Sequence, residues 1–308
     1  MILDGTFLRK LDTLSLVARR ARAGQTAGER RSTKRGASVE FADYRDYAKG
    51  DDLRRVDWNI YARLERPYVK LFEEQEDLAV HLLLDGSGSM DWGEEGDKGT
   101  GGQGDKENGA NKWLYARRLA AALGYVALTS GDRLTVANLQ SPIPNLQSHF
   151  GPARGRGHTL RLFDWLENLE AMGATDLNAR LRSYTISGGR AGLVILISDL
   201  FSPLGYIEGL TALAARGHEV TVIHLLSPDE VEPPLGGDLR LLDVETGDSQ
   251  EVTIDGGMRA LYRRRLAAWR DEIRATCRAR DVRYVPVETD IPFERVVLYD
   301  LRRAGLLK

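Results

Sequence analysis

The chain has 308 residues, enough for one large domain or two modest ones. Apolar residues make up 42% and charged residues 29%, as in ordinary soluble globular proteins, and the net charge of −2 argues against a protein that binds polyanions with its whole surface. The single cysteine, Cys277, excludes a disulfide framework and a cysteine-rich zinc site and fits a reducing compartment. Apolar runs such as 193–197 fall far short of the ~20 residues that a membrane-spanning helix needs, and charged residues interrupt the N-terminus. We therefore expect a cytoplasmic protein without a secretory signal.

Residues 1–75 are expected to form an N-terminal helix and a small subdomain. Apolar side chains at helical spacing over 4–23 predict an amphipathic helix that Gly24 ends. Residues 38–75 combine aromatic side chains with alternating charges, which predicts a subdomain that either fastens to its neighbour or binds a partner. Between the two lies a basic stretch with one acid, Glu29, among Arg19, Arg20, Arg22, Arg30, Arg31, Lys34 and Arg35. A solvated loop is its simplest interpretation, with an acidic protein or a phosphate backbone as the alternative.

From residue 76 onward the patterns of strands and helices alternate. Apolar runs with the length of buried strands occupy 78–84, 133–139, 192–197, 219–226 and 283–287. Helical patterns cover 112–129, 160–169, 177–184, 206–215 and a long stretch through 258–273, and Pro292 opens a last helix. Residues 238–255 predict a hairpin, and the glycine-rich, acidic segment 94–110 predicts a flexible insertion. This order predicts an α/β domain over 76–308, with a mostly parallel sheet covered by helices on both faces.

Oxygen-bearing side chains follow two of the predicted strands. The first strand ends at Asp85, and Ser87 and Ser89 come directly after it. A second apolar strand ends at Asp199, and Thr175 lies in a loop before a helix whose N-cap we assign to Asp176. Ligands of open parallel sheets bind at the carboxyl ends of the strands, and hydroxyl and carboxylate oxygens suit a hard divalent cation. We therefore expect Asp85, Ser87, Ser89, Thr175 and Asp199 to gather around such a cation.

The Asp-x-Ser-x-Ser motif, followed by a distant Thr and a distant Asp, resembles the metal-ion-dependent adhesion site of von Willebrand factor type A domains. The resemblance implies a von Willebrand factor A-like, Rossmann-like fold. It also implies that Ser87, Ser89 and Thr175 bind the metal directly, whereas Asp85 and Asp199 act largely through water. One position on the cation then stays open for an acidic side chain of a partner protein. Mg²⁺ is the expected ion, with Mn²⁺ or Ca²⁺ as alternatives.

A second resemblance lies in the segment "EFADYRDYAKGDDLRRVDWNIYARLERPYVKLFEEQED". It resembles the signature of a bacterial and archaeal family catalogued as "domain of unknown function 58", and the likeness extends over most of the chain from about residue 30. The matching residues are Arg45, Tyr47, Gly50, Asp51, Arg54, Trp58, Ala62, Arg63, Val69 and Lys70. Many members carry transmembrane helices ahead of this region, so this chain looks like the short soluble form.

The family resemblance implies a function without catalysis. Its members resemble companions of MoxR-type AAA+ ATPases, and such pairs are thought to act like chaperones that mature other protein complexes. We therefore expect a metal-dependent adaptor that binds an ATPase partner rather than an enzyme.

Two other classes of function stay open. A serine hydrolase could use Ser87, but Gly86-Ser87-Gly88-Ser89 does not match the Gly-x-Ser-x-Gly elbow, and a triad would need one of five histidines. These are His81, His149, His158, His218 and His224; His218 and His224 flank or occupy a strand, where packing is expected. A nucleic-acid-associated protein would depend on the basic stretch near 19–35 alone.

Overall fold

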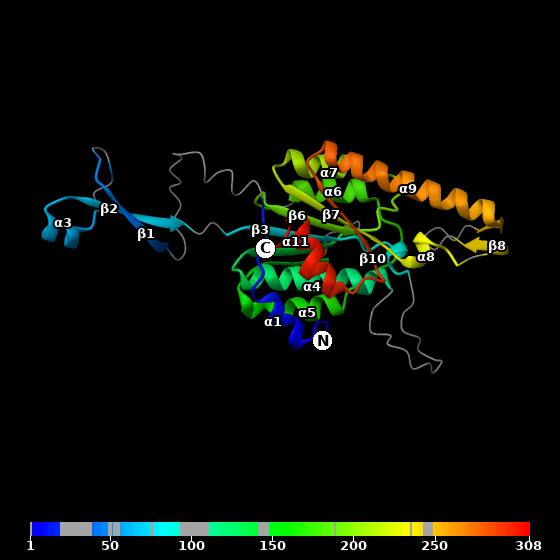
Figure 1. Cartoon of the computed structure of the whole chain (residues 1–308), viewed down its shortest axis with the longest axis horizontal. Coiled ribbons are helices and arrows are strands. Elements are labelled where there is room, and N and C mark those ends of the chain that lie inside the picture. The colour runs from blue at the N-terminus through cyan, green and yellow to red at the C-terminus, as the bar shows by residue number, and fades with distance from the viewer. Residues whose placement is uncertain are drawn as a thin grey trace. The chain divides into compact units, whose positions relative to one another are not determined.

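Figure 1 shows the computed structural model of the chain, in which residues 2–18, 39–48, 51, 56–74, 77–92, 111–140, 148–187, 189–234, 236–242 and 249–308 are described here. The basic stretch near 19–35 and the insertion at 94–110 lie outside these residues. The chain divides into two compact units, Met1–Gly24 with Leu78–Lys308, and Gln25–Asp77. This division differs from the expected boundary after residue 75 because the N-terminal helix packs within the larger unit, where the rings of Phe7 and Phe293 lie 5.1 Å apart.

The larger unit is built on a six-stranded sheet with the order β10-β7-β6-β3-β4-β5. Its strands are β3 (Ala79–Leu84), β4 (Arg133–Asn138), β5 (His149–Arg154), β6 (Leu193–Ser198), β7 (Glu219–Leu226) and β10 (Arg283–Glu288). Neighbouring strands are parallel except β5, which pairs antiparallel with β4 at the edge. The sequence does not predict β5, because Gly151 and Pro152 interrupt its apolar pattern. The predicted α/β class with a central, mostly parallel sheet is confirmed.

Helices cover both faces of this sheet (Figure 1). One face carries α1 (Gly5–Leu11), α4 (Lys112–Thr129), α5 (Thr159–Glu167) and the C-terminal helical turns α10 (Phe293–Arg295), η4 (Val296–Asp300) and α11 (Leu301–Arg303). The other face carries α6 (Leu177–Ser187), α7 (Ile207–Ala215) and α9 (Gly256–Ala279). Successive side chains of a strand point to opposite faces, so Leu82 joins the first core and Leu83 the second. Both faces of β3 are buried, which explains why its apolar run is unbroken.

The predicted helix at 4–23 is wrong over residues 12–18, and residues 19–23 lie outside the described residues. Helix α1 begins after the N-cap Asp4 and ends at Leu11, and the following residues run extended beside the C-terminus. There Val17 N donates to Leu306 O (2.9 Å) and Lys308 N donates to Ser15 O (3.1 Å). Leu14, Leu16 and Ala18 are buried in alternation, which is the period of a strand, so tertiary pairing overrides the helical pattern here.

The smaller unit pairs β1 (Val39–Asp46) antiparallel with β2 (Tyr68–Glu74), and α3 (Trp58–Leu64) lies between them in the sequence. Asp57 caps α3 by accepting hydrogen bonds from Asn59 N and Ile60 N, and it also accepts one from the Tyr44 hydroxyl (3.1 Å). Among the family-signature residues, Arg45 forms a two-pronged ion pair with Asp51 at 2.8 and 2.7 Å. Part of this signature therefore closes the turn after β1.

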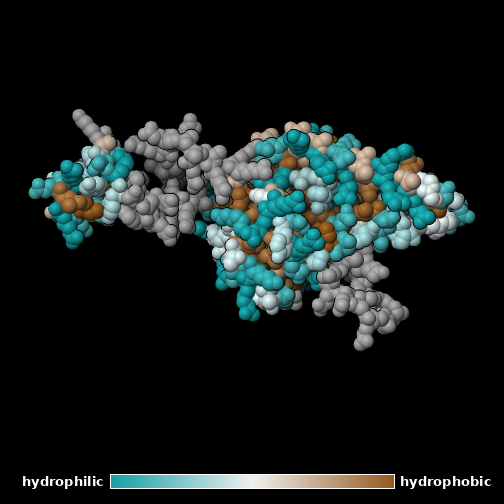
Figure 2. All heavy atoms as spheres, viewed as in Figure 1, coloured by the Kyte–Doolittle hydropathy of each residue, from teal (hydrophilic) through white to brown (hydrophobic). Residues whose placement is uncertain are grey.

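Two short elements follow β7: α8 (Pro228–Val231) and the antiparallel hairpin of β8 (Gly237–Leu242) and β9 (Ser249–Ile254), which confirms the predicted hairpin. Hydrophilic side chains cover most of the visible face of the larger unit, with apolar ones in smaller patches (Figure 2). Within the described part of the chain, no helix combines the length and hydrophobicity needed to cross a membrane.

His218 is buried just before β7, at the amino end of the sheet. Gly192 N donates to His218 Nδ1 (3.3 Å), and the rings of His218 and His81 lie 5.1 Å apart. Burial, and then the neighbouring His81, lower the pKa of His218 from 6.5 to about 4. The folded protein therefore keeps this imidazole neutral at a pH where the unfolded chain protonates it.

This difference predicts a loss of stability in mild acid. The contribution of a neutral His218 is complete above pH 6.5 and is lost as the pH falls toward 4; it amounts to about 3 kcal/mol over that range. A His218→Asn variant, which keeps an acceptor for Gly192 N, should lose less stability between pH 7 and pH 4.5 in urea titrations. His158→Asn, on a half-exposed turn, is the control. Equal losses in the wild type and His218→Asn would contradict the prediction.

Candidate metal centre

The loop after β3 fixes the carboxylate of Asp85 inside the protein. Asp85 is buried, and its backbone N–H donates to Ile197 O (3.0 Å) on the neighbouring strand β6. Asp85 Oδ1 accepts from Ser87 N (3.1 Å), and Asp85 Oδ2 accepts from the Ser198 hydroxyl (2.6 Å). Sequence analysis did not single out Ser198, although its place directly before Asp199 at the end of a buried strand is the signal that would have found it. The two strand ends are thus joined by backbone and side-chain hydrogen bonds.

Ser87 and Ser89 bring two hydroxyls together in this loop. Their Oγ atoms lie 3.0 Å apart, with Ser87 buried and Ser89 half-buried. A single helical turn, η2 (Gly88–Met90), begins between them, so the chain bends at once after Asp85. At the preceding position, a Cβ on Gly86 would lie 2.2 Å from Asn138 Oδ1, so a larger residue there would force the Asn138 side chain to move.

The loop that carries Thr175 is hydrogen-bonded to the Asp85 loop. Gly88 N donates to Gly173 O (2.7 Å), and Met172 N donates to Gly86 O (2.9 Å). Thr175 itself is buried, and within the described residues its hydroxyl Oγ1 has no hydrogen-bond partner. A buried hydroxyl without a hydrogen-bond partner lowers the stability of the fold. A ligand bound to this oxygen would remove that cost. Asp176, beside it, caps α6 through Ala179 N (2.9 Å), which confirms its predicted role.

Asp199 lies at the same edge of the sheet but already has a cationic partner. It is fully buried at the end of β6, and its Oδ1 accepts from Phe201 N (3.0 Å). Its Oδ2 accepts from the ammonium of Lys112 (2.7 Å), which also donates to Glu230 Oε1 of α8 (2.5 Å). Sequence analysis missed both partners. The signal for Lys112 is a lysine in the first turn of a helix, where the helix dipole disfavours a cation, and Ser227-x-x-Glu230 is a capping-box pattern.

The charges in this cluster do not balance. The carboxylates of Asp85, Asp199 and Glu230 against the ammonium of Lys112 leave a formal charge of −2. Burial, and then the nearby charge of Asp199, raise the pKa of Asp85 to about 6, against the hydrogen bonds from Ser198 and Ser87, which lower it. A divalent cation at this edge would offset the excess negative charge.

The donor set fits a hard divalent cation held by hydroxyls. Among the described residues there is no cluster of three or more His, Cys, Asp or Glu side chains suited to a metal. The oxygen donors are instead the paired serine hydroxyls, the unpartnered Thr175 hydroxyl and two carboxylates behind them. Mg²⁺ accepts such a set because it keeps several waters and takes few charged protein ligands.

Two histidines near the sheet have other partners than Ser87. His81 contacts the Tyr184 hydroxyl (2.7 Å) and Arg190 O (3.0 Å) through its two ring nitrogens. His224 contacts the Tyr284 hydroxyl (2.7 Å) and the backbone oxygen of Asp199 (3.0 Å) in the same way. The ring nitrogens of both histidines therefore form hydrogen bonds within the fold, and the Ser87 hydroxyl contacts that of Ser89 instead.

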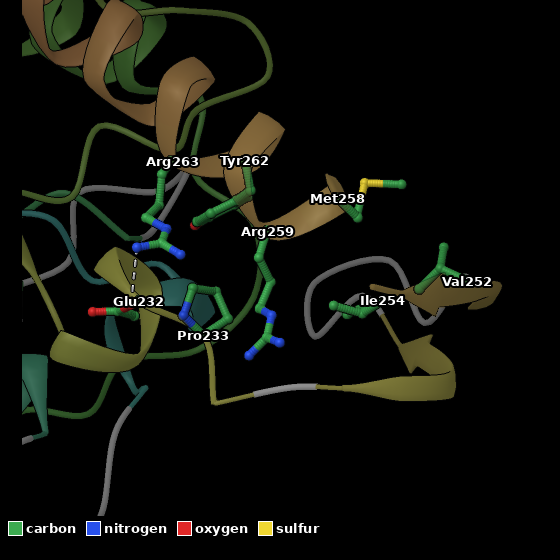
Figure 3. A pocket seen from close by; sticks show the side chains of 8 residues that line it. All are labelled: Glu232, Pro233, Val252, Ile254, Met258, Arg259, Tyr262 and Arg263. Atoms are coloured by element: carbon green, nitrogen blue, oxygen red, sulfur yellow. Dashed lines mark ion pairs between the residues drawn. The ribbon is translucent and has the colours of Figure 1, made fainter. Parts of the chain in front are cut away.

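A pocket of about 240 Å³ lies elsewhere, between the β8–β9 hairpin and the start of α9 (Figure 3). Its lining residues are Glu232, Pro233, Val252, Ile254, Met258, Arg259, Tyr262 and Arg263. Arg263 pairs with Glu232 (3.3 Å), and the Tyr262 hydroxyl donates to Glu230 O (2.5 Å). Residue Glu230 of α8 therefore has two contacts. Its backbone oxygen accepts from Tyr262, which lines this pocket, and its carboxylate accepts from the ammonium of Lys112.

The fold and the site together define an α/β protein with buried oxygen donors gathered at the carboxyl edge of a mostly parallel sheet. Within that class, the chain belongs to the DUF58 family: the model described as "Protein of unknown function DUF58" matches residues 43–272. The family resemblance expected from residues 40–77 is thereby confirmed.

Two relatives extend this result. The uncharacterized protein Rv1480 of Mycobacterium tuberculosis (strain ATCC 25618 / H37Rv) is 30% identical over 290 residues, which cover 93% of this chain and 86% of that protein. The uncharacterized protein MAV169 of Mycobacterium avium is 39% identical over 101 residues, 33% of this chain and 59% of that protein.

Solved structures show a more distant likeness. The conserved hypothetical protein BatB from Bacteroides thetaiotaomicron matches with a TM-score of 0.40 and 16% identity, covering 74% of this chain and 98% of that one. An aerotolerance-related membrane protein from Bacteroides fragilis NCTC 9343 matches with a TM-score of 0.41 and 14% identity, covering 73% and 99%.

Proposed function

We propose that this chain is a metal-dependent protein-interaction module, and that its larger unit is a von Willebrand factor A-like domain. Ser87, Ser89 and Thr175 would bind a divalent cation directly. Asp85 and Asp199 would interact with the cation through bound water molecules. Mg²⁺ is the proposed ion, with Mn²⁺ or Ca²⁺ as alternatives. When bound, the cation supplies an open coordination position for a carboxylate of the partner protein.

The observation that carries this proposal is the Thr175 hydroxyl. It is buried without a hydrogen-bond partner among the described residues, on a loop hydrogen-bonded to the loop of Ser87 and Ser89. Native proteins rarely leave such a group unpaired unless a ligand or water completes it. The formal charge of −2 left by the buried carboxylates of Asp85 and Asp199, the partly buried carboxylate of Glu230 and the ammonium of Lys112 gives independent support for a divalent cation.

The protein partner follows from the family resemblance. A MoxR-type AAA+ ATPase in the same cytoplasm would supply nucleotide hydrolysis, while this chain would supply the cation-dependent contact. The pair would then act like a chaperone on other protein complexes.

The test is capture of the MoxR-type ATPase of the same organism on the immobilised full chain. We expect capture in MgCl₂, loss of capture in EDTA, and loss in Asp85→Ala and Ser87→Ala even with MgCl₂, because the first removes a carboxylate and the second a hydroxyl from the site. Ser187→Ala is the matched control, since the hydroxyl of this exposed serine donates to Ser183 O (3.1 Å) and Tyr184 O (3.5 Å) within α6. Capture that persists unchanged in EDTA would overturn the proposed function.

A further inference from the structure

Lys112 is a cation in an unfavourable place. It is the first residue of α4 and is fully buried. Burial removes the hydration of its ammonium, and the positive end of the helix dipole repels a cation at the first turn. Such a residue persists only where neighbouring anions offset both costs.

The neighbours of the Lys112 ammonium meet that requirement. Asp199 Oδ2 lies at 2.7 Å and Glu230 Oε1 at 2.5 Å, and the centroid of the Phe201 ring lies at 5.4 Å. Asp199 and Glu230 come from the end of β6 and from α8, so the ammonium joins two elements at the carboxyl edge of the sheet. Glu230 is itself fixed by the capping box with Ser227.

The ammonium of Lys112 also affects the candidate metal centre, because it pairs with one of its carboxylates. Asp199 is one of the two carboxylates proposed to stand behind the cation, and its Oδ2 is already committed to Lys112. A positive charge beside this carboxylate weakens its attraction for a second cation. It also stabilises the carboxylate when no cation is present, because a buried, unpaired carboxylate is costly.

We propose that Lys112 is a built-in counter-ion that keeps the site assembled without a divalent cation and lowers the site's affinity for one. The inference rests on the proposed function, since it assumes a cation at this edge. Lys112 is a positioning residue in this account: it acts on the cation through Asp199. Cation binding to the wild type is then reversible and is not required for folding.

The test compares Lys112→Met with the wild type in EDTA and in MnCl₂. Methionine keeps an unbranched chain of similar length and removes the charge. We expect Lys112→Met to melt at a lower temperature in EDTA, to gain far more from MnCl₂ than the wild type, and to bind Mn²⁺ at least about tenfold more tightly in electron paramagnetic resonance titrations. Lys112→Arg, which keeps the charge, should bind Mn²⁺ weakly, and Lys10→Met on the exposed face of α1 should match the wild type.

Each outcome decides between the two proposals. Mn²⁺ binding of equal or lower affinity in Lys112→Met overturns the role of Lys112 and leaves the metal-dependent module standing. If Lys112→Met binds Mn²⁺ and the wild type does not, the result supports the role of Lys112 and overturns cation dependence of the wild type. Absence of Mn²⁺ binding in both proteins overturns both. If Lys112→Met does not fold, the double variant Lys112→Met with Glu230→Gln, which leaves one fewer buried charge, takes its place in the same measurements.

Discussion

Replacing Asp199 by alanine is expected to lower the free energy of unfolding by about 3 kcal/mol, measured in EDTA. The substitution removes one of the two carboxylate partners of the fully buried Lys112 and leaves its ammonium with Glu230 alone. Breaking a buried ion pair by removing one partner costs about 3–5 kcal/mol, and the contact with Glu230 places this case at the lower end. The backbone N–H of Phe201 also loses its acceptor.

A surface ion pair provides the matched control. Glu208 pairs with Arg182 at 3.0 Å, but both side chains are more than half exposed. Glu208→Ala should therefore change the free energy of unfolding by less than about 1 kcal/mol. Urea unfolding of the two variants beside the wild type measures the contrast. Similar small losses in both would mean that the Lys112–Asp199 pair does not stabilise the edge of the sheet.

Replacing Thr175 by valine is expected to act in opposite directions on stability and on cation binding. Valine has nearly the same shape and removes a buried hydroxyl that lacks a partner among the described residues, so the protein in EDTA should gain about 1 kcal/mol of stability. Affinity for Mn²⁺ should fall by at least about 100-fold, because even groups that only support a metal ligand contribute about 10–100-fold.

Thr159→Val separates these two effects. Thr159, at the start of α5, is likewise buried with an unpartnered hydroxyl within the described chain, but it is not in the Thr175 loop. It should reproduce the gain in stability with unchanged Mn²⁺ affinity. Thermal unfolding in EDTA and Mn²⁺ titration measure both quantities. Thr175→Val with wild-type Mn²⁺ affinity would exclude Thr175 as a ligand.

The sequence alone determined the class of fold and the positions of the polar strand ends. The apolar runs at 78–84 and 192–197 predict buried parallel strands, and both are central in the sheet. Asp85 and Asp199 then had to lie at one edge, because parallel neighbours end on the same side. The signature near Arg45 and Trp58 was sufficient for the family. These features follow from local patterns, which a single sequence carries.

Tertiary structure alone decided which groups meet at that edge. Lys112 and Glu230 are separated by 118 residues, and nothing local in either segment predicts their contact with Asp199. The extended course of Leu14, Leu16 and Ala18 is likewise set by the antiparallel bridge from Leu16 to Leu307, 291 residues further along the chain (307 − 16). A spacing pattern reports which side of an element is apolar, whereas the pairing of buried charges depends on distances that exist only once the whole sheet and its helices have packed.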